Sequence, residues 1–259
     1  MHIDTLMMNT TKTLYKYFSL EGEYTAYSEQ MLSRHEVFFS KPGEFNDPFD
    51  CRGLWSNKGT RKEKLSFYRR MAKEMYPNLG EPAFEEKVKA LIRDQEKQNR
   101  SKYFPTYVAK DYLVYCMSEK RDDLLMWSHY ANKHRGFVVG FRCTPESLLF
   151  SAAKEVDYTN TYPKVSYRHS AEQSMKICLY TKSIKWRYEK EYRTILNASP
   201  NRIRSYEHTC LTEIIFGCDM KTADKETIRK FVSAGQSNPQ YFECFLDDNQ
   251  YKLNILKTG

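Results

Sequence analysis

The chain has 259 residues, of which 41% are hydrophobic and 15% aromatic, and a formal net charge of +8. This composition supports a packed core and excludes wholesale disorder, and the length favours a single domain over residues 1–259. No run approaches the ~18 apolar residues that span a bilayer, and the N-terminal stretch lacks the long apolar segment of a signal peptide. We therefore expect a cytoplasmic protein without a membrane partner.

Hydrophobic periodicity and turn residues predict strands that occur in clusters. The expected strands cover residues 13–19, 36–41, 112–117, 136–141, 191–196, 212–216, 241–246 and 251–256. The expected helices cover residues 24–34, 61–76, 82–98, 123–133, 170–181 and 223–233. Because strands and helices do not alternate strictly, we predict an α+β fold with a mixed, largely antiparallel sheet. The two charged helices form a helical insertion at about residues 57–105.

Positive charge is concentrated in two blocks of the sequence. Residues 52–110 hold 15 Lys or Arg against 7 Asp or Glu, and residues 160–206 hold 10 against 3. Such blocks attract polyanions by counterion release, which makes nucleic acid a candidate partner, although solvated helix faces are also rich in Lys and Arg. The seven cysteines show neither a Cys-x-x-Cys pair nor a zinc spacing, which is typical of reduced core thiols.

A first motif, Phe-Asn-Asp-Pro-Phe-Asp, occupies residues 45–50. Asp47 precedes a proline and must be extended, while Asn46 and Asp47 can fold their side chains back onto local backbone groups. The motif is therefore a rigid polar loop. The alternative is an architectural turn held in place by Phe45 and Phe49.

A second motif, Met-Trp-Ser-His-Tyr-Ala, lies on the helix expected at residues 123–133. Helical spacing places Trp127, Tyr130 and His134 on one surface, which suits the stacking of a flat ring and the presentation of a proton donor. The alternative is a core helix with a hydrogen-bonded histidine. His129 and His134 have no third metal ligand nearby in the sequence, so we predict no metal site.

The third motif, Trp-Arg-Tyr-Glu-Lys-Glu-Tyr-Arg, covers residues 186–193. If it is a strand, Glu189, Glu191 and Arg193 share one face, and Tyr188 and Tyr192 the other. Two carboxylates so close together repel, and this favours the protonation of one unless a cation is nearby. Arg193 is the candidate cation. An ordinary ladder of ion pairs on a surface strand is the alternative.

Together with the Tyr-Lys-Tyr strand at residues 15–17, these motifs resemble an uncharacterised bacterial family. Some of its members are similar to abortive-infection proteins of phage defence. The resemblance runs from about Leu14 to Ile195, and it implies an accessory or defence role.

A more distant similarity, to ADP-ribosyltransferases, implies a chemistry and an ADP-ribosyltransferase-like fold. In that family a first-strand His or Arg binds the adenylate side of NAD, a second strand ends in serine, and a late Glu-x-Glu strand carries the glutamate that stabilises an oxocarbenium-like state. Lys16 or Tyr17 takes the first role here, Ser40 the second, and Glu191, with Glu189 beside it, the third. This chain departs from the pattern because its first strand has no Arg or His.

The similarity implies NAD as the substrate, with Glu191 and Glu189 as the catalytic residues. It further implies cofactor contacts from Lys16, Tyr17, Ser40, Asn46, Asp47, Trp127, His129, Tyr130 and Arg193.

The leading hypothesis is a toxin or phage-defence effector that transfers ADP-ribose from NAD to a macromolecule. The basic blocks favour RNA, then DNA, over protein as the acceptor, and an antitoxin or chaperone partner is a further expectation. One alternative is a metal-independent nuclease that uses His129 and the glutamate pair as acid and base. Another is a non-catalytic nucleic-acid-binding or interaction module built on the basic helices of residues 61–98.

Overall fold

The computed structural model describes residues 11–56, 58–98 and 112–258. These residues fall into two compact units. Unit 1 lies within Met1–Lys41, Tyr112–Val156 and Lys185–Gly259, and unit 2 within Pro42–Asp111 and Asp157–Ile184. The helical insertion expected at about 57–105 belongs to unit 2, although residues 57 and 99–105 lie outside the described residues. The single-domain organisation stays a prediction.

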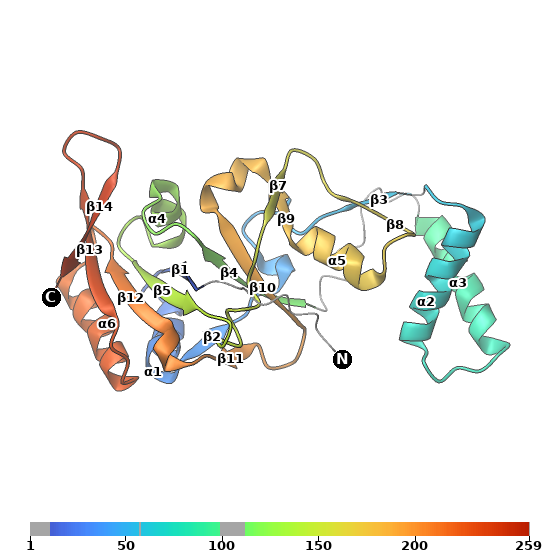
Figure 1. Cartoon of the computed structure of the whole chain (residues 1–259), viewed down its shortest axis with the longest axis horizontal. Coiled ribbons are helices and arrows are strands. Elements are labelled where there is room, and N and C mark those ends of the chain that lie inside the picture. The colour runs from blue at the N-terminus through green and yellow to red at the C-terminus, as the bar shows by residue number, and fades with distance from the viewer. Residues whose placement is uncertain (1–10, 57, 99–111, 259) are drawn as a thin grey trace. The chain divides into compact units, whose positions relative to one another are not determined.

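Unit 1 is built on an eight-stranded sheet with the order β14-β13-β12-β5-β1-β4-β10-β6 (Figure 1). The strands are β1 (Lys12–Phe18), β4 (Tyr112–Ser118), β5 (Phe137–Cys143), β6 (Lys154–Glu155), β10 (Glu191–Asn197), β12 (Leu211–Phe216), β13 (Gln240–Leu246) and β14 (Leu253–Thr258). All neighbours are antiparallel except β12 and β13, which are parallel and joined by helix α6 (Thr222–Ala234). The predicted α+β class with a largely antiparallel sheet is confirmed.

The two faces of this sheet are covered by different helices. Helices α1 (Tyr24–Arg34) and α6 pack on one face, where Met31 and Ile228 join a core with Leu14 and Tyr115. Helix α4 (Leu124–Tyr130) covers the other face, where its aromatic and thioether side chains pack with strand residues such as Tyr17. A two-stranded sheet of β2 (Glu36–Phe38) and β11 (Ile203–Ser205) and a 3-10 helix, η4 (His208–Cys210), complete unit 1.

In its described residues, unit 2 contains short strands and three α-helices. Its strands are β3 (Leu54–Ser56), β7 (Asp157–Thr159), β8 (Lys164–Ser166) and β9 (Thr181–Ser183), paired in parallel as β3 with β8 and β7 with β9. Its helices are α2 (Arg61–Met75), α3 (Ala83–Gln98) and α5 (Ala171–Leu179), preceded by the 3-10 helix η1 (Pro42–Glu44). The sequence did not predict these strands, because three residues are too few to show a period.

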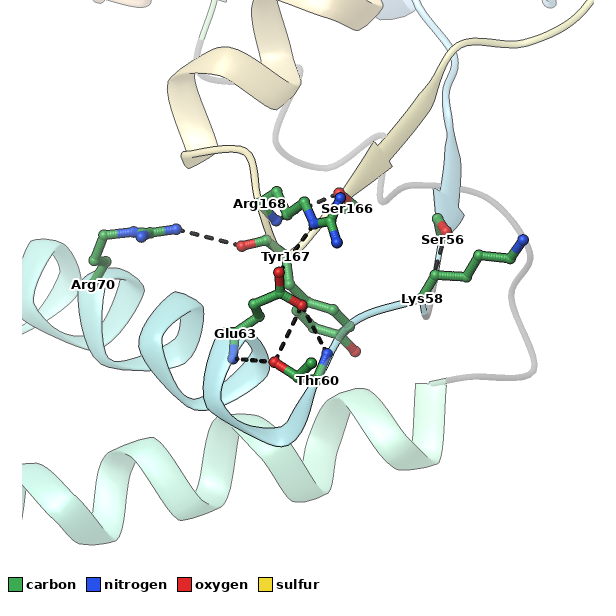
Figure 2. Close-up of polar contacts among 8 residues, drawn as sticks. All are labelled: Ser56, Lys58, Thr60, Glu63, Arg70, Ser166, Tyr167 and Arg168. Carbon is green, nitrogen blue, oxygen red and sulfur yellow. Dashed lines mark hydrogen bonds and ion pairs between the residues drawn. The ribbon is translucent and has the colours of Figure 1, made fainter.

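Helix α2 begins where its sequence predicts, at a capping box (Figure 2). The hydroxyl of Thr60 accepts a hydrogen bond from the backbone N–H of Glu63 at 3.2 Å, and the Glu63 carboxylate accepts one from the backbone N–H of Thr60 at 2.7 Å. The same carboxylate forms an ion pair of 3.0 Å with Arg168, which follows β8. Segments about a hundred residues apart in sequence are thereby joined within unit 2.

Two predicted elements around the motifs differ in the structure. The strand predicted at 191–196 begins at Glu191 as expected, but the third motif is not one continuous strand: residues Ile184–Glu189 form a 3-10 helix, η3, and Lys190 adopts a left-handed conformation with φ of 44°. Helix α4 ends at Tyr130 rather than at residue 133, because Asn132, Lys133 and His134 all have positive φ.

All seven cysteines are free, and five of them are buried, as expected for reduced core thiols: Cys51, Cys143, Cys178, Cys210 and Cys244.

Candidate functional site

The second and third motifs meet in unit 1. The hydroxyl of Tyr130, in the last turn of α4, donates a hydrogen bond of 2.7 Å to the carboxylate of Glu189 at the end of η3. One residue earlier, the ring of His129 lies 6.3 Å from the ring of Trp186. The sequence does not indicate how these two segments pack against each other. The structure shows that they are in contact.

The predicted pairing of Arg193 with a motif glutamate is confirmed. Arg193 donates two hydrogen bonds to Glu191, from Nε at 2.6 Å and from Nη2 at 3.0 Å. The Arg193 side chain is fully buried and that of Glu191 is 5% exposed, so water screens this ion pair very little. The bidentate geometry fixes the planes of both groups.

Glu189 lies close to Glu191 in the sequence and is buried like it, but its backbone conformation differs from the one expected. It does not lie on the strand with Glu191, and a side-chain alternation across residues 189–193 is therefore wrong. The turn at Lys190 nevertheless leaves Glu189 only 3% exposed. Its backbone carbonyl accepts a hydrogen bond of 2.5 Å from the hydroxyl of Ser118 on β4. Two buried carboxylates therefore lie two residues apart, each held by a hydrogen-bond donor.

Strand β4 supplies residues that the motifs did not indicate. In the antiparallel register, Ser118 lies opposite Glu191, and Cys116 lies opposite Arg193. Desolvation by the surrounding protein raises the pKa of the Cys116 thiol, and the charge of Glu191 raises it further. The thiol is therefore neutral beside the ion pair. Ser118 and Cys116 could not be predicted as neighbours of the ion pair, because their position follows from the pairing of β4 with β10, which are far apart in the sequence.

The first strand contributes less than the resemblance implies. Cross-strand neighbours share a face, and Tyr15 lies opposite Ser118, which lies opposite Glu191. Lys16 therefore lies on the other face, where its ammonium group is 4.8 Å from the ring centre of Tyr115. Lys16 and Glu191 therefore lie on opposite faces of the sheet, because successive side chains on a strand alternate, and the cofactor contact expected of Lys16 stays a prediction.

Tyr17 shares the face of Glu191 but is a core residue. Its hydroxyl donates a hydrogen bond of 2.9 Å to the backbone carbonyl of Lys120, and its ring packs edge-on to Trp127 at 5.5 Å. Burial and the charge of Asp123 raise the pKa of Tyr17, so the phenol stays neutral.

Ser40 lies apart from the carboxylates, and Trp127 is a core residue. The backbone of Ser40 pairs with Val114, four residues along β4 from Ser118 and so about 13 Å away along the strand. Trp127 is fully buried, and its indole N–H donates to the carbonyl of Arg121 at 2.9 Å. Its expected role as a wall for a ligand is corrected to a core role, because the indole has no exposed surface.

Asn46 and Asp47 lie in unit 2, whereas the two carboxylates lie in unit 1. Asp47 accepts a hydrogen bond of 2.8 Å from the backbone N–H of Phe49, which is the local turn predicted for this loop. Phe49 is 64% exposed, however, so it does not pin the turn from inside as the architectural alternative requires.

Within residues 11–56, 58–98 and 112–258, no group of three or more His, Cys, Asp or Glu side chains is arranged to hold a metal ion. None of the helices in the same residues has the length and apolar character needed to cross a bilayer.

Residues 126–194 match a protein family described as protein of unknown function (DUF2971). The matched stretch begins in α4 and ends in β10, so it contains both segments of the site in unit 1. No curated protein matches the chain. No solved structure matches it either.

Proposed function

We propose that the chain is an effector enzyme that cleaves NAD and transfers ADP-ribose to a macromolecule. The observation that supports this proposal is the pair of buried carboxylates, Glu189 and Glu191, each oriented by a hydrogen-bond donor at one end of the sheet. Buried carboxylates are costly to maintain and contribute little net stability, which favours a chemical role for them.

The chemistry requires little more than a carboxylate in a desolvated place. When the bond between nicotinamide and ribose breaks, its electron pair leaves with nicotinamide and positive charge develops on the ribose. A fixed carboxylate stabilises that charge, and a nucleophile of the acceptor then forms the new bond to the ribose carbon and loses its proton.

We assign this role to Glu189. Its buried carboxylate accepts a hydrogen bond from Tyr130, whereas Glu191 is held in a bidentate pair by Arg193, which suits Glu191 to positioning. Glu191 and Arg193 are then positioning residues that hold the start of β10. Because Glu189 is only 3% exposed, the substrate must displace a side chain that covers it.

The basic blocks support a polyanionic acceptor, and we propose RNA before DNA. We place the activity in the cytoplasm, as expected for a phage-defence effector, with an antitoxin or chaperone partner restraining it there.

Incubation of the purified protein with labelled NAD and cell extract, followed by separate nuclease and protease digestion, tests the proposal. We expect label in the RNA fraction and release of nicotinamide. Glu189→Gln should abolish both, and Tyr130→Phe should reduce both by about tenfold or more, as for the loss of an orienting hydrogen bond. Glu243→Gln, at an ion pair outside the site, should leave both unchanged. Absence of NAD consumption by the folded protein would refute the proposal.

The exposure of His129 favours a second candidate, a metal-independent nuclease. His129 lies beside Tyr130 on α4, and Tyr130 is hydrogen-bonded to Glu189, so a potential acid and a potential base both neighbour this tyrosine. Shortening of RNA in the absence of NAD would identify this activity, provided that the His129→Gln variant no longer shortens RNA.

A non-catalytic binding module is the remaining alternative. It would be identified if charge reversal in α2 and α3 abolished RNA binding and the protein showed no catalysis in any assay.

A further inference from the structure

Unit 2 contains a cavity that the site in unit 1 does not use. Its volume is about 420 Å³, and it is lined by residues from β7, β9, the loop after β7, the first motif and the segment that follows that motif. Pockets of about 300–1,000 Å³ are typical of small-molecule sites, so this one is large enough for a mononucleotide.

One side of the cavity is aromatic. Phe49 lines it and is 64% exposed, and Tyr162 also lines it. Phe49 is held outward by a closed turn, in which its backbone N–H donates to the Asp47 carboxylate at 2.8 Å and the N–H of Asp50 donates to the Asp47 carbonyl at 3.1 Å. An exposed phenyl ring on a fixed turn at a cavity is a surface on which a flat base can stack.

The cavity is also cationic. Lys182 on β9 and Arg52 both line it. The ammonium group of Lys182 lies 3.7 Å from the Asp50 carboxylate, and both side chains are almost fully buried, at 6% and 3% exposure. The formal charges of Lys182, Arg52 and Asp50 sum to +1. A phosphate group would complement this charge.

The backbone between these charged residues is held in an unfavourable conformation. Cys51 has φ of 53°, in the left-handed region that a non-glycine residue seldom adopts. The Asp50 carboxylate accepts a hydrogen bond of 2.6 Å from the N–H of Cys51. This turn directs the chain from Asp50 to Arg52, and such strain is characteristic of ligand sites.

Hydroxyl groups complete the lining. Thr159 donates its proton to the carbonyl of Thr161 at 2.6 Å, and Thr181 donates its proton to the carbonyl of Ile177 at 2.6 Å. Each hydroxyl oxygen therefore presents lone pairs, which suit the amino group of a base or the hydroxyl groups of a ribose.

We propose that this cavity binds a nucleotide, with the phosphate at Arg52 and Lys182 and the base against Phe49 or Tyr162. The ligand is either a free nucleotide or the phosphorylated end of an RNA chain, since both present the same chemistry. This site gives a role to the first motif, and it is independent of the reaction proposed for unit 1.

Calorimetric titration of the full chain with AMP, adenosine and inorganic phosphate tests the proposal. We expect AMP to bind at least about tenfold more tightly than adenosine or phosphate alone, because base and phosphate contribute separately. Phe49→Ala and Arg52→Gln should each weaken AMP binding by about tenfold or more. Leu79→Ala, at an exposed apolar residue outside the cavity, and Arg168→Gln, at the exposed pair in Figure 2, should bind AMP as the native chain does.

Competition by a 5′-phosphorylated oligonucleotide separates the two sources of the ligand. Displacement of AMP by the oligonucleotide identifies an RNA end, and failure of displacement identifies a free nucleotide. Absence of AMP binding, phosphate binding as tight as that of AMP, or unchanged AMP binding in both Phe49→Ala and Arg52→Gln would overturn the proposal. Glu189→Gln should bind AMP normally, so failure of the unit 1 reaction does not affect this result.

Discussion

Replacing Arg193 by methionine should greatly destabilise unit 1. The substitution keeps an unbranched side chain but removes both hydrogen bonds to Glu191, at 2.6 and 3.0 Å. Because both side chains are 5% exposed or less, the buried Glu191 carboxylate would lose its guanidinium partner where water compensates little. Breaking a buried pair in this way costs about 3–5 kcal/mol. This corresponds to about two to four powers of ten in the unfolding equilibrium constant.

Urea unfolding followed by circular dichroism measures this cost. With a slope of about 3 kcal/mol per molar urea, the midpoint for Arg193→Met should fall by about 1 to 1.7 M. Adding Glu191→Met should restore much of the stability, because an apolar pair removes the buried carboxylate that has lost Arg193. Lys225→Met, at the more exposed pair with Glu243, should cost at most about 1 kcal/mol. A cost for Arg193→Met as small as for Lys225→Met would refute the reasoning.

Two further substitutions test other parts of unit 1. Gly217→Ala should destabilise the fold by about 1–3 kcal/mol in thermal unfolding, because the added Cβ would lie only 2.0 Å from the backbone carbonyl of His134. Equal stability would contradict this close approach. Burial and the neighbouring His208 lower the pKa of His35 from its usual 6.5, so the unfolded chain binds this proton more readily and stability falls as the pH drops below 6.5. His35→Asn should reduce the loss of melting temperature between pH 7 and 5, and an unchanged loss would count against this assignment.

The sequence predicted the regular elements well where periodicity and end signals agree. Helix α1 has the predicted bounds, and α2 begins at its capping box because Thr60 and Glu63 satisfy each other locally. Each of these elements is specified by neighbours a few residues apart. Local signals therefore sufficed for most of the helices and for the longer strands.

The candidate site was predicted less completely because its geometry depends on register and on single backbone conformations. The positive φ of Lys190 separates Glu189 from the strand that begins at Glu191, and nothing in the alternation of residues 186–193 indicates that turn. The contact between Tyr130 and Glu189 depends on how α4 packs on the sheet. The walls of the cavity in unit 2 come from segments more than a hundred residues apart, Phe49 to Leu54 and Thr159 to Ser183.

The buried thiols give the chain native chemical reporters of unfolding. Burial raises the pKa of Cys143 in unit 1 and of Cys178 in unit 2 to about 12, so almost no thiolate exists at neutral pH. Since alkylating reagents attack the thiolate, each cysteine reacts only in molecules whose surrounding structure has opened. Mass spectrometry that follows the two modification rates in one sample therefore measures whether the two units unfold together or separately, without any engineered label.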